Sequence, residues 1–334
     1  MPFPMTHRPA IDRALTGAFG TTSLEAAAPL SGGLSAAQVY KIRVGGIDYL
    51  LRVEGARDLF RDPGRWYGCM RTAAAAFLAP RVRHADPVDG VAIMDFIPEQ
   101  SLSLDYVGDR TAMVTELAQA VRALHATPPF PPLMDYLDAM EGLIGQMRAT
   151  GFTPAQTLSE PLALYGKVAQ AYRGLPVDLV SSHNDLNPRN ILYDGARLWL
   201  IDWESAFLAD RWVDLATLAN FYTSNPGEEE TLLRVYFGQA PDDAQRARLY
   251  LARQINHIFY AVMFLSGAAA ERPGTVLPSV QAPALAALHQ ALGQGDDVLG
   301  SWEGRAAYGL ARLNAAARNI ADPACATALT ILGL

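Results

Sequence analysis

The stretch that decides the fold is residues 183–204, HNDLNPRNILYDGARLWLIDWE. Within it, residues 191–193 and 198–201 are short apolar runs, and such runs predict two β-strands. The dipeptide Asp194-Gly195 follows the first run. It is typical of a tight turn, because glycine adopts positive φ without steric cost. The stretch therefore predicts a β-hairpin.

Closing this hairpin brings its two ends together. Asn190 stands at the entry and Asp202 at the exit, and Asp185 lies on the loop that leads into the first strand. We therefore expect two carboxylates and a carboxamide to converge, and hard oxygen ligands of this kind suit Mg²⁺. Phosphoryl transfer needs such a set: one group that orients the attacking hydroxyl, and ligands for the metal that holds the nucleotide phosphates. An ordinary hairpin with polar ends is the alternative.

The stretch resembles the catalytic loop and metal-binding segment of the choline kinase and aminoglycoside phosphotransferase family, which are small-molecule kinases with a protein-kinase-like fold. The pattern His-x-Asp-x-x-x-x-Asn and then Ile-Asp-Trp-Glu is carried here by His183, Asp185, Asn190, Asp202 and Glu204. The resemblance implies that Asp185 is the catalytic base and that Asn190 and Asp202 are magnesium ligands. It implies an accessory metal ligand or substrate contact for Glu204. His183 belongs to the catalytic loop and is expected to fix its geometry. The Asp-Trp-Glu form is more typical of the choline kinase branch.

Composition bounds the remaining possibilities. The chain has 334 residues, of which half are hydrophobic, so it is long enough for a sizeable core and two domains or lobes. A formal charge of −7 without any basic run argues against nucleic-acid binding and is compatible with a cationic substrate. Cys69 and Cys325 form neither a disulfide framework nor a metal-ligand spacing. No apolar run reaches the ~18 residues of a spanning helix, and residues 1–8 lack a signal-peptide layout. We expect a cytoplasmic protein without membrane contact; the sequence leaves the oligomeric state open.

The first hundred residues predict a small antiparallel sheet. A helix is expected over residues 8–20, then strands that end at Leu30 and that span 38–44 and 47–53, and a further strand pair over 81–85 and 91–96. The turn between the first two strands contains Gly32, Gly33 and Ser35. A glycine turn lets backbone amides approach phosphates closely, so by the resemblance these residues bind nucleotide. A plain turn is the alternative.

Arg52 lies in an otherwise apolar strand, Leu50-Leu51-Arg52-Val53. A buried charge is costly without a partner, so we expect one. By the resemblance, Arg52 takes the place of the lysine or arginine that binds the nucleotide phosphates; a surface charge on an edge strand is the alternative.

The family helix that follows, here about residues 66–78, usually supplies a glutamate to pair with that cation. This chain has no acidic residue between Asp62 and Leu78, and Arg71 falls near the expected place. Either Glu54 or Asp58 supplies the partner, or the ion pair is absent. A kinase of reduced activity, or a pseudokinase, therefore remains open.

Residues 94–98, Met-Asp-Phe-Ile-Pro, match the connection between the lobes. The resemblance implies that backbone groups of Asp95 and Ile97 bind adenine and that Met94 lies at the back of that pocket. From Pro98 onward the pattern is helical. In the stretch 245–265, the aromatic residues Tyr260 and Phe264 are explained by core packing; an aromatic cage for a quaternary ammonium group, as in choline kinases, is the alternative.

Together these features predict an α+β chain with a bilobal protein-kinase-like fold: an N-lobe over 1–97 with a small antiparallel sheet, and a larger, mainly helical C-lobe over 98–334. The expected activity is ATP-dependent, Mg²⁺-dependent transfer of a γ-phosphoryl group to a hydroxyl of a small molecule, of the choline, amino-alcohol or aminoglycoside type. The alternative is a catalytically weak or inactive kinase-like nucleotide-binding protein. The Walker A, nucleophile-elbow and His-Glu-x-x-His motifs of other enzyme classes are missing.

Overall fold

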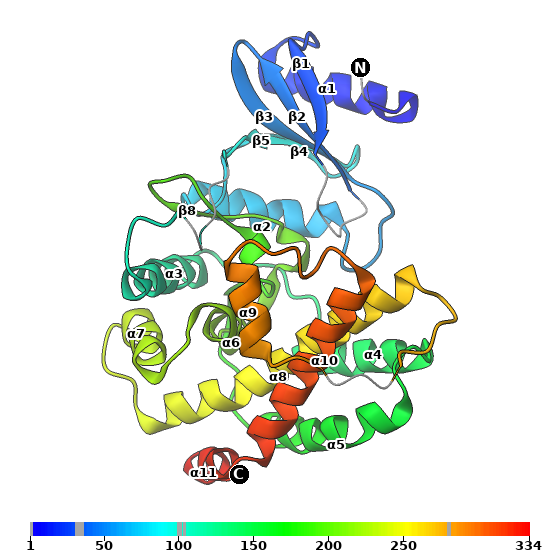
Figure 1. Ribbon diagram of the computed structural model, residues 1–334. Coiled ribbons are helices and arrows are strands. Elements are labelled where there is room, and N and C mark those ends of the chain that lie inside the picture. Colours follow the sequence, from blue (N-terminus) through cyan, green and yellow to red (C-terminus); the bar gives the residue numbers. More distant parts are fainter. Residues whose placement is uncertain (1–2, 31–36, 99–101, 103–104, 279–281) are drawn as a thin grey trace. The chain divides into compact units, whose positions relative to one another are not determined.

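The computed structural model describes residues 3–30, 37–98, 102, 105–278 and 282–334 (Figure 1). The turn containing Gly32, Gly33 and Ser35 lies outside the described residues. The chain divides into two compact units. We call residues 1–107, 122–132 and 180–208 the sheet unit, and residues 108–121, 133–179 and 209–334 the helical unit. The division into lobes at residue 97 stays a prediction.

The sheet unit is built on five antiparallel strands: β1 (Ala26–Leu30), β2 (Gln38–Val44), β3 (Ile47–Val53), β4 (Val82–Asp86) and β5 (Val91–Asp95). Their order in the sheet is β1-β2-β3-β5-β4. β2 and β3 begin and end where the sequence predicts. The turn between them needs glycine, because Gly45 (φ 59°) and Gly46 (φ 77°) both have left-handed backbone.

One face of this sheet packs against α1 (Arg8–Phe19) (Figure 1). Alternate residues of a strand point to opposite faces, so Tyr49, Leu51 and Val53 face the helix and are buried there. The same alternation directs Arg52 to the opposite face, away from α1. The helix α2 (Pro63–Ala75) follows, capped by Asp62, whose side chain accepts a hydrogen bond from the Gly64 amide.

Residues 180–208 add the short elements that carry the polar motif with which the sequence analysis began. Two two-stranded sheets occur here, formed by β6 (Leu179–Ser182) with β9 (Phe207–Asp210) and by β7 (Ile191–Tyr193) with β8 (Leu198–Leu200). Single 3-10 turns precede β7 (Pro188–Asn190) and follow β8 (Trp203–Ser205). A further 3-10 turn, Met5–His7, leads into α1.

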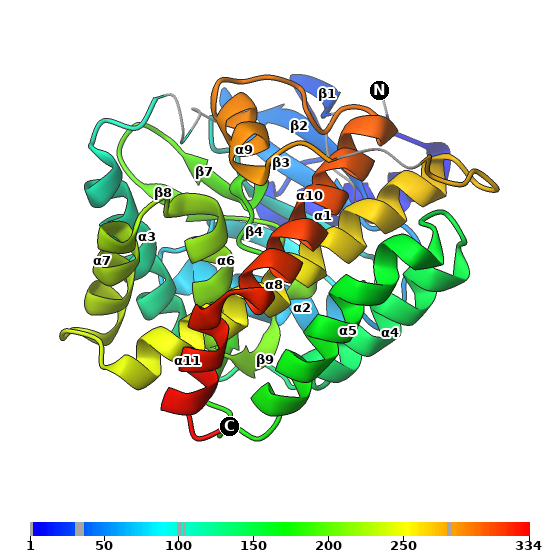
Figure 2. The ribbon, with the colours of Figure 1, turned by 60° about the horizontal axis from the view of Figure 1, so that its bottom comes forward.

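The helical unit is built mainly from nine helices within the described residues. They are α3 (Arg110–His125, whose last turn belongs to the sheet unit), α4 (Tyr136–Ala149), α5 (Ala155–Tyr172), α6 (Trp212–Tyr222), α7 (Pro226–Phe237), α8 (Asp243–Glu271), α9 (Leu285–Gly293), α10 (Trp302–Ala321) and α11 (Pro323–Ile331). Figure 2 shows α8 and α10 lying along each other. Their contact is close at Gly309, where an added Cβ would come within 2.8 Å of the Leu265 side chain. Within the part of the chain that the structure describes, none of the helices has the length and apolar character needed to cross a bilayer.

A fully buried arginine, Arg312, lies at the centre of this unit. Its guanidinium donates to the Tyr308 hydroxyl (2.8 Å) and to His257 Nδ1 (3.1 Å). It also lies 4.2 Å from the ring centroid of Phe221 and 5.4 Å from that of Tyr260. Core packing, one of the two explanations for the aromatic residues of stretch 245–265, therefore holds for Tyr260, and the cation that its ring meets belongs to the chain itself.

Two histidines of this cluster, His257 and His289, are kept neutral. Burial, with the Arg312 charge as the next cause, lowers the pKa of His257 well below its ordinary value and lowers the pKa of His289 to about 3. The hydrogen bonds agree with this. The Tyr308 oxygen accepts from Arg312, so its own proton is available to His289 Nε2 at 2.9 Å, which must then be unprotonated.

The stability of the protein should therefore fall in mild acid. Because the pKa of His289 is lowered in the folded state, the unfolded chain takes up a proton below about pH 6.5 while the folded chain stays neutral until about pH 3. The stabilisation is thus complete above pH 6.5 and is lost as the pH falls. When the pH is lowered from 8 to 5, wild type should lose about 2 kcal/mol more of its unfolding free energy than His289→Gln loses.

Urea denaturation at the two pH values measures this shift, and the value at pH 8 serves as the control, since there it reports only the packing change. A difference that is the same at both pH values would show that His289 is not buried in its neutral form.

Candidate active site

The predicted hairpin is present. Ile191 of β7 pairs with Leu200 of β8, and the Ile201 amide donates to the Asn190 carbonyl at 2.9 Å. In the connecting loop, the Asp194 carboxylate accepts hydrogen bonds from the backbone amides of Ala196 and Arg197. Such side-chain bonds to the following backbone are typical of Asp in turns. Asn190 and Ile201 are thus backbone neighbours, and Asp202 follows directly. The local sequence accounts for this geometry, because apolar runs and turn chemistry alone set the register.

His183 connects the start of the loop over residues 183–190 to the end of the hairpin. Its imidazole is fully buried, lies against the tilted ring of Trp203 with ring centroids 4.6 Å apart, and has Nε2 2.9 Å from the Ile201 carbonyl oxygen. A carbonyl only accepts, so this contact requires the proton on Nε2. The ring thus links the start of this loop to the end of the hairpin. The geometric role predicted for His183 stays a prediction.

Asp185 is held by two carboxamides. Asn187 Nδ2 donates to its Oδ1 at 2.9 Å, and Asn190 Nδ2 donates to its Oδ2 at 3.1 Å and to its backbone oxygen at 2.8 Å. Each oxygen of the half-buried carboxylate therefore has a neutral donor that fixes its direction. The Asn190 nitrogen is committed to Asp185, which leaves the side-chain oxygen of Asn190 as the atom that can bind a metal. The contribution of Asn187 was not predicted from the sequence.

Arg52 is the centre of a charge cluster on the face of the sheet opposite α1. It is 8% exposed, and its guanidinium donates to Glu54 at 2.9 Å, to Asp202 at 3.3 Å and, in a short contact, to Glu204. Its guanidinium carbon also lies 5.0 Å from the ring centroid of Trp66. The buried arginine therefore has the charged partner that we expected for it. The alternative, a surface charge on an edge strand, does not hold.

Glu54 supplies the carboxylate that α2 lacks. It lies two residues after Arg52, on the same face of the sheet, and its Oε1 also accepts from the Tyr67 hydroxyl of α2 at 3.2 Å. Burial raises the pKa of that tyrosine, with Glu54 as a second cause, so it stays protonated and donates. Asp58, the other candidate partner of Arg52 in the sequence, instead accepts hydrogen bonds from the backbone amides of Phe60 and Arg61.

The predicted adenine contacts lie on and after β5. Met94 is buried and pairs with Leu50 of β3. The Asp95 amide donates to the Arg81 carbonyl at 2.9 Å, so this amide is not available to a base. The Asp95 carboxylate pairs with Arg83 at 2.6 Å, and Ile97 is half-buried. Nucleotide binding by Met94, Asp95 and Ile97 stays a prediction, as it does for Gly32, Gly33 and Ser35.

Comparison with known proteins agrees with this geometry. A model of the phosphotransferase enzyme family matches residues 26–250, well over half of the chain. The chain belongs to this family.

Solved structures show the same fold. They include a choline/ethanolamine kinase family protein from Mesorhizobium loti (22% identity, 98% of both chains covered, TM-score 0.67) and the choline kinase LicA from Streptococcus pneumoniae (18% identity, 95% of this chain and 99% of that one, TM-score 0.59). A spectinomycin phosphotransferase in complex with ADP and spectinomycin is a third (14% identity, 79% of this chain and 89% of that one, TM-score 0.53). Among curated proteins none matches. The α+β, protein-kinase-like fold predicted from the sequence is thus confirmed, and family membership supports a small-molecule phosphotransferase.

The residues of this phosphotransferase fit a bound magnesium ion only in part. Among the described residues, no three His, Cys, Asp or Glu side chains are grouped as a metal cage. Mg²⁺ does not need one, because it is usually held by one or two carboxylates together with substrate phosphates and water. The Asp202 carboxylate, whose side chain is 37% exposed, is a ligand of this type. The side-chain oxygen of Asn190 would supply a second, uncharged oxygen ligand. Glu204 has its Oε1 on Arg52, and its predicted role as a metal ligand remains untested.

Asp202 has an unusual backbone that suits this position. Both Asp202 and Asn184 adopt left-handed φ angles of 64°. Asp and Asn are the non-glycine residues that tolerate this region best. The Asn184 side chain donates to the Ser205 carbonyl at 2.9 Å, which joins the catalytic loop to the segment after Asp202. The Asp202 carboxylate is thereby directed from a fixed backbone.

Arg65 holds the backbone of this segment, and the sequence analysis did not find it. From the first turn of α2, its buried guanidinium donates to the carbonyls of Phe60 (2.5 Å), Glu204 (2.6 Å) and, in a short contact, Ala206. Burial lowers its pKa. One signal existed: a cation in the first turn opposes the helix dipole, so an arginine there needs a specific partner.

Replacing Arg65 should destabilise the fold. Arg65→Met removes the guanidinium donors of three carbonyls, and buried acceptors that lose a partner cost about 1–3 kcal/mol each before relaxation. We therefore expect the free energy of unfolding to fall by about 2–4 kcal/mol. Arg61→Met, which removes an exposed arginine paired with Asp58, is the matched control and should change it by less than about 0.5 kcal/mol.

Urea denaturation followed by circular dichroism compares the two variants. Equal, small effects for both would mean that Arg65 does not support the backbone around Glu204.

Proposed function

We propose that the protein is an ATP-dependent small-molecule kinase that transfers the γ-phosphoryl group to a hydroxyl group of its acceptor. The observation that carries the proposal is the hydrogen-bonded set in which Asn190 holds the Asp185 carboxylate, while the hairpin pairs the backbone of Asn190 with Ile201, the residue before Asp202. Phosphoryl transfer depends mainly on positioning and electrostatic stabilisation, and these groups supply both.

Asp185 is the proposed proton acceptor. Its carboxylate has a fixed direction, since Asn187 and Asn190 each donate to one of its oxygens. It would orient the attacking hydroxyl and take its proton as the new bond forms. Both of these donors are neutral carboxamides, which fix the direction of the group.

Asn190 and Asp202 are the proposed metal ligands, and Arg52 the proposed phosphate-binding cation. A bound Mg²⁺ would neutralise charge that develops on the phosphate oxygens. In the structure Arg52 contacts Asp202 and Glu204, which places this cation beside the same carboxylates. Glu204 would then act mainly as the ion-pair partner that keeps Arg52 in place, with metal contact as a secondary role.

The acceptor is proposed to be an amino alcohol of the choline or ethanolamine type, or an aminoglycoside. The similar solved proteins include choline kinases and a spectinomycin kinase, which support both classes. The net charge of −7 fits a cationic acceptor. The protein is proposed to act in the cytoplasm.

A nucleotide-binding protein without turnover is the second candidate. One observation favours it: Arg52 already occupies Asp202, the carboxylate that would hold the metal. The Arg52–Glu54 pair argues against it, because the ion pair that the lack of an acidic residue in α2 put in doubt is present. Incubation with ATP and a panel of amino alcohols, aminoglycosides and sugars, followed by mass spectrometry, separates the two. A kinase phosphorylates at least one compound; a protein without turnover phosphorylates none.

Asp185→Asn should leave nucleotide binding intact and impair turnover. The substitution keeps the shape of the side chain but removes its basicity, so we expect kcat on the acceptor found by the panel to fall by about 10²–10⁴. The affinity for Mg-ADP, measured by calorimetry, should stay within about twofold of wild type. Glu160→Gln, an exposed carboxylate of α5, is the control and should change neither. An unchanged kcat in Asp185→Asn would remove this residue from the mechanism.

Asp202→Asn should abolish the effect of magnesium on nucleotide binding. Asparagine accepts the left-handed backbone of position 202, whereas alanine would add strain. Loss of the charged ligand weakens the metal site, so we expect wild type to bind ADP more tightly when Mg²⁺ is added and the variant to show no such gain. Calorimetric titrations with ADP, with and without Mg²⁺, measure this. A variant that still gains affinity with Mg²⁺ would refute the assignment of Asp202.

A further inference from the structure

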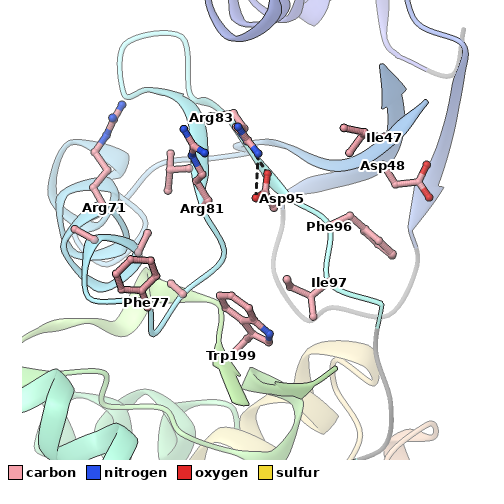
Figure 3. Close-up of a pocket in the computed structure, with 14 residues that line it drawn as sticks. Ile47, Asp48, Arg71, Phe77, Arg81, Arg83, Asp95, Phe96, Ile97 and Trp199 are labelled. Atoms are coloured by element: carbon pink, nitrogen blue, oxygen red, sulfur yellow. Dashed lines mark hydrogen bonds and ion pairs between the residues drawn. The ribbon is translucent and has the colours of Figure 1, made fainter. Parts of the chain in front are cut away.

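A cavity lies within the sheet unit (Figure 3). It is separate from the residues assigned above to catalysis and metal binding. Its volume is about 770 Å³, which is in the range of small-molecule sites. It is formed by the start of β3, the last turns of α2, the following turn, β4, residues 95–97 and a side chain of β8. Neither Arg52, Asp185, Asn190 nor Asp202 lines it.

The two acidic side chains of this cavity are already neutralised. Asp95 forms an ion pair with Arg83 at 2.6 Å, which Figure 3 shows on the cavity wall. Asp48 accepts from Arg43 at 2.6 Å and from Lys41 at 2.9 Å, and these contacts lower its pKa. The carboxylates therefore offer no strong attraction to a cationic ligand.

Two arginines of the wall have no acidic partner. Arg71 uses its side chain to donate to the Ala85 carbonyl at 2.6 Å, and that neutral oxygen does not balance its charge. Arg81 forms no hydrogen bond or ion pair through its side chain with any described residue. In Figure 3 both side chains lie along the same side of the cavity as Arg83. The wall therefore carries a net positive charge on two exposed guanidinium groups, which suits an anion.

The opposite side of the cavity is apolar, and it includes a residue held in an unfavourable backbone conformation. Phe77 is 70% exposed and has φ 59°. A bulky side chain in the left-handed region is an outlier that costs roughly 1–3 kcal/mol, and such strain gathers at functional sites. Figure 3 shows Phe77 and Trp199 on one side of the cavity, with Ile97 near the indole. Glycine or asparagine at position 77 would serve the fold better, so an exposed aromatic ring there is best explained by a ligand.

We propose that this cavity binds a small organic anion whose charge is attached to a flat, apolar group. Arg71 and Arg81 would contact the anion with charge-assisted hydrogen bonds, and Phe77 and Trp199 would pack against the apolar group. The site is independent of the proposed kinase activity, since it uses none of those residues. It shares Asp95 and Ile97 with the segment predicted to bind adenine, so an occupant would be placed directly behind that segment.

Calorimetry with naphthalene-1-sulfonate as the probe tests the proposal on the full chain without nucleotide. We expect one binding site per chain. Naphthalene-1-methanol, which lacks the charge, and sodium sulfate, which lacks the ring, should each bind at least about tenfold more weakly. Absence of probe binding, or equal binding of either partial probe, would overturn the proposal.

Substitutions locate the bound probe. Arg71→Gln with Arg81→Gln should weaken binding of naphthalene-1-sulfonate by about tenfold or more, whereas Arg234→Gln, the same change at an exposed position of α7, should not alter it. Phe77→Gly should weaken binding severalfold while the melting temperature is unchanged or higher, because the backbone strain is removed. Unchanged affinity in the double arginine variant would place the probe elsewhere and refute the site.

Discussion

The structure of the sheet unit depends on one buried guanidinium, that of Arg52, placed among three carboxylates. Any buried cation needs compensation, and breaking a buried pair is far more costly than never having formed it. Glu54 directly follows the strand that carries Arg52, whereas Asp202 and Glu204 lie 150 and 152 residues further along the chain than Arg52. A single charge therefore fastens the first sheet to the segment after the hairpin. The three carboxylates in turn need Arg52, because without it their charges would repel one another in a half-buried place.

The helix α2 does not supply a carboxylate to Arg52, but two of its side chains support the residues around that ion pair. It contains no acidic residue, so it cannot supply the glutamate that the family resemblance implies. Instead, its Arg65 binds backbone carbonyls on both sides of Ser205, and its Tyr67 hydroxyl donates to Glu54. The ion pair is kept, but its carboxylate comes from Glu54, directly after β3. This redistribution explains how a chain that departs from the family pattern in α2 can still hold Asp202 and Glu204 in a defined place.

The local parts of this arrangement could be predicted from the sequence. The hairpin of β7 and β8, the strands β2 and β3 and the turn at Gly45-Gly46 follow from apolar runs and turn residues, which act over a few positions. The partner of Arg52 could only be narrowed to alternatives, because choosing Glu54 over Asp58 requires the tertiary packing of α2 on the sheet. The same holds for Arg65 and for Arg312, whose partners come from distant segments.

The most direct measurement is a crystal structure of the protein with ADP and Mg²⁺ bound. We predict one magnesium ion bonded to the side-chain oxygen of Asn190 and to the Asp202 carboxylate at about 2.0–2.1 Å, with the Asp185 carboxylate facing the end of the phosphate chain and Arg52 still paired with Glu54. A nucleotide held with its metal on other residues, or Asn190 and Asp202 pointing into different spaces, would contradict the central claim that the hairpin exists to bring these groups onto one ion.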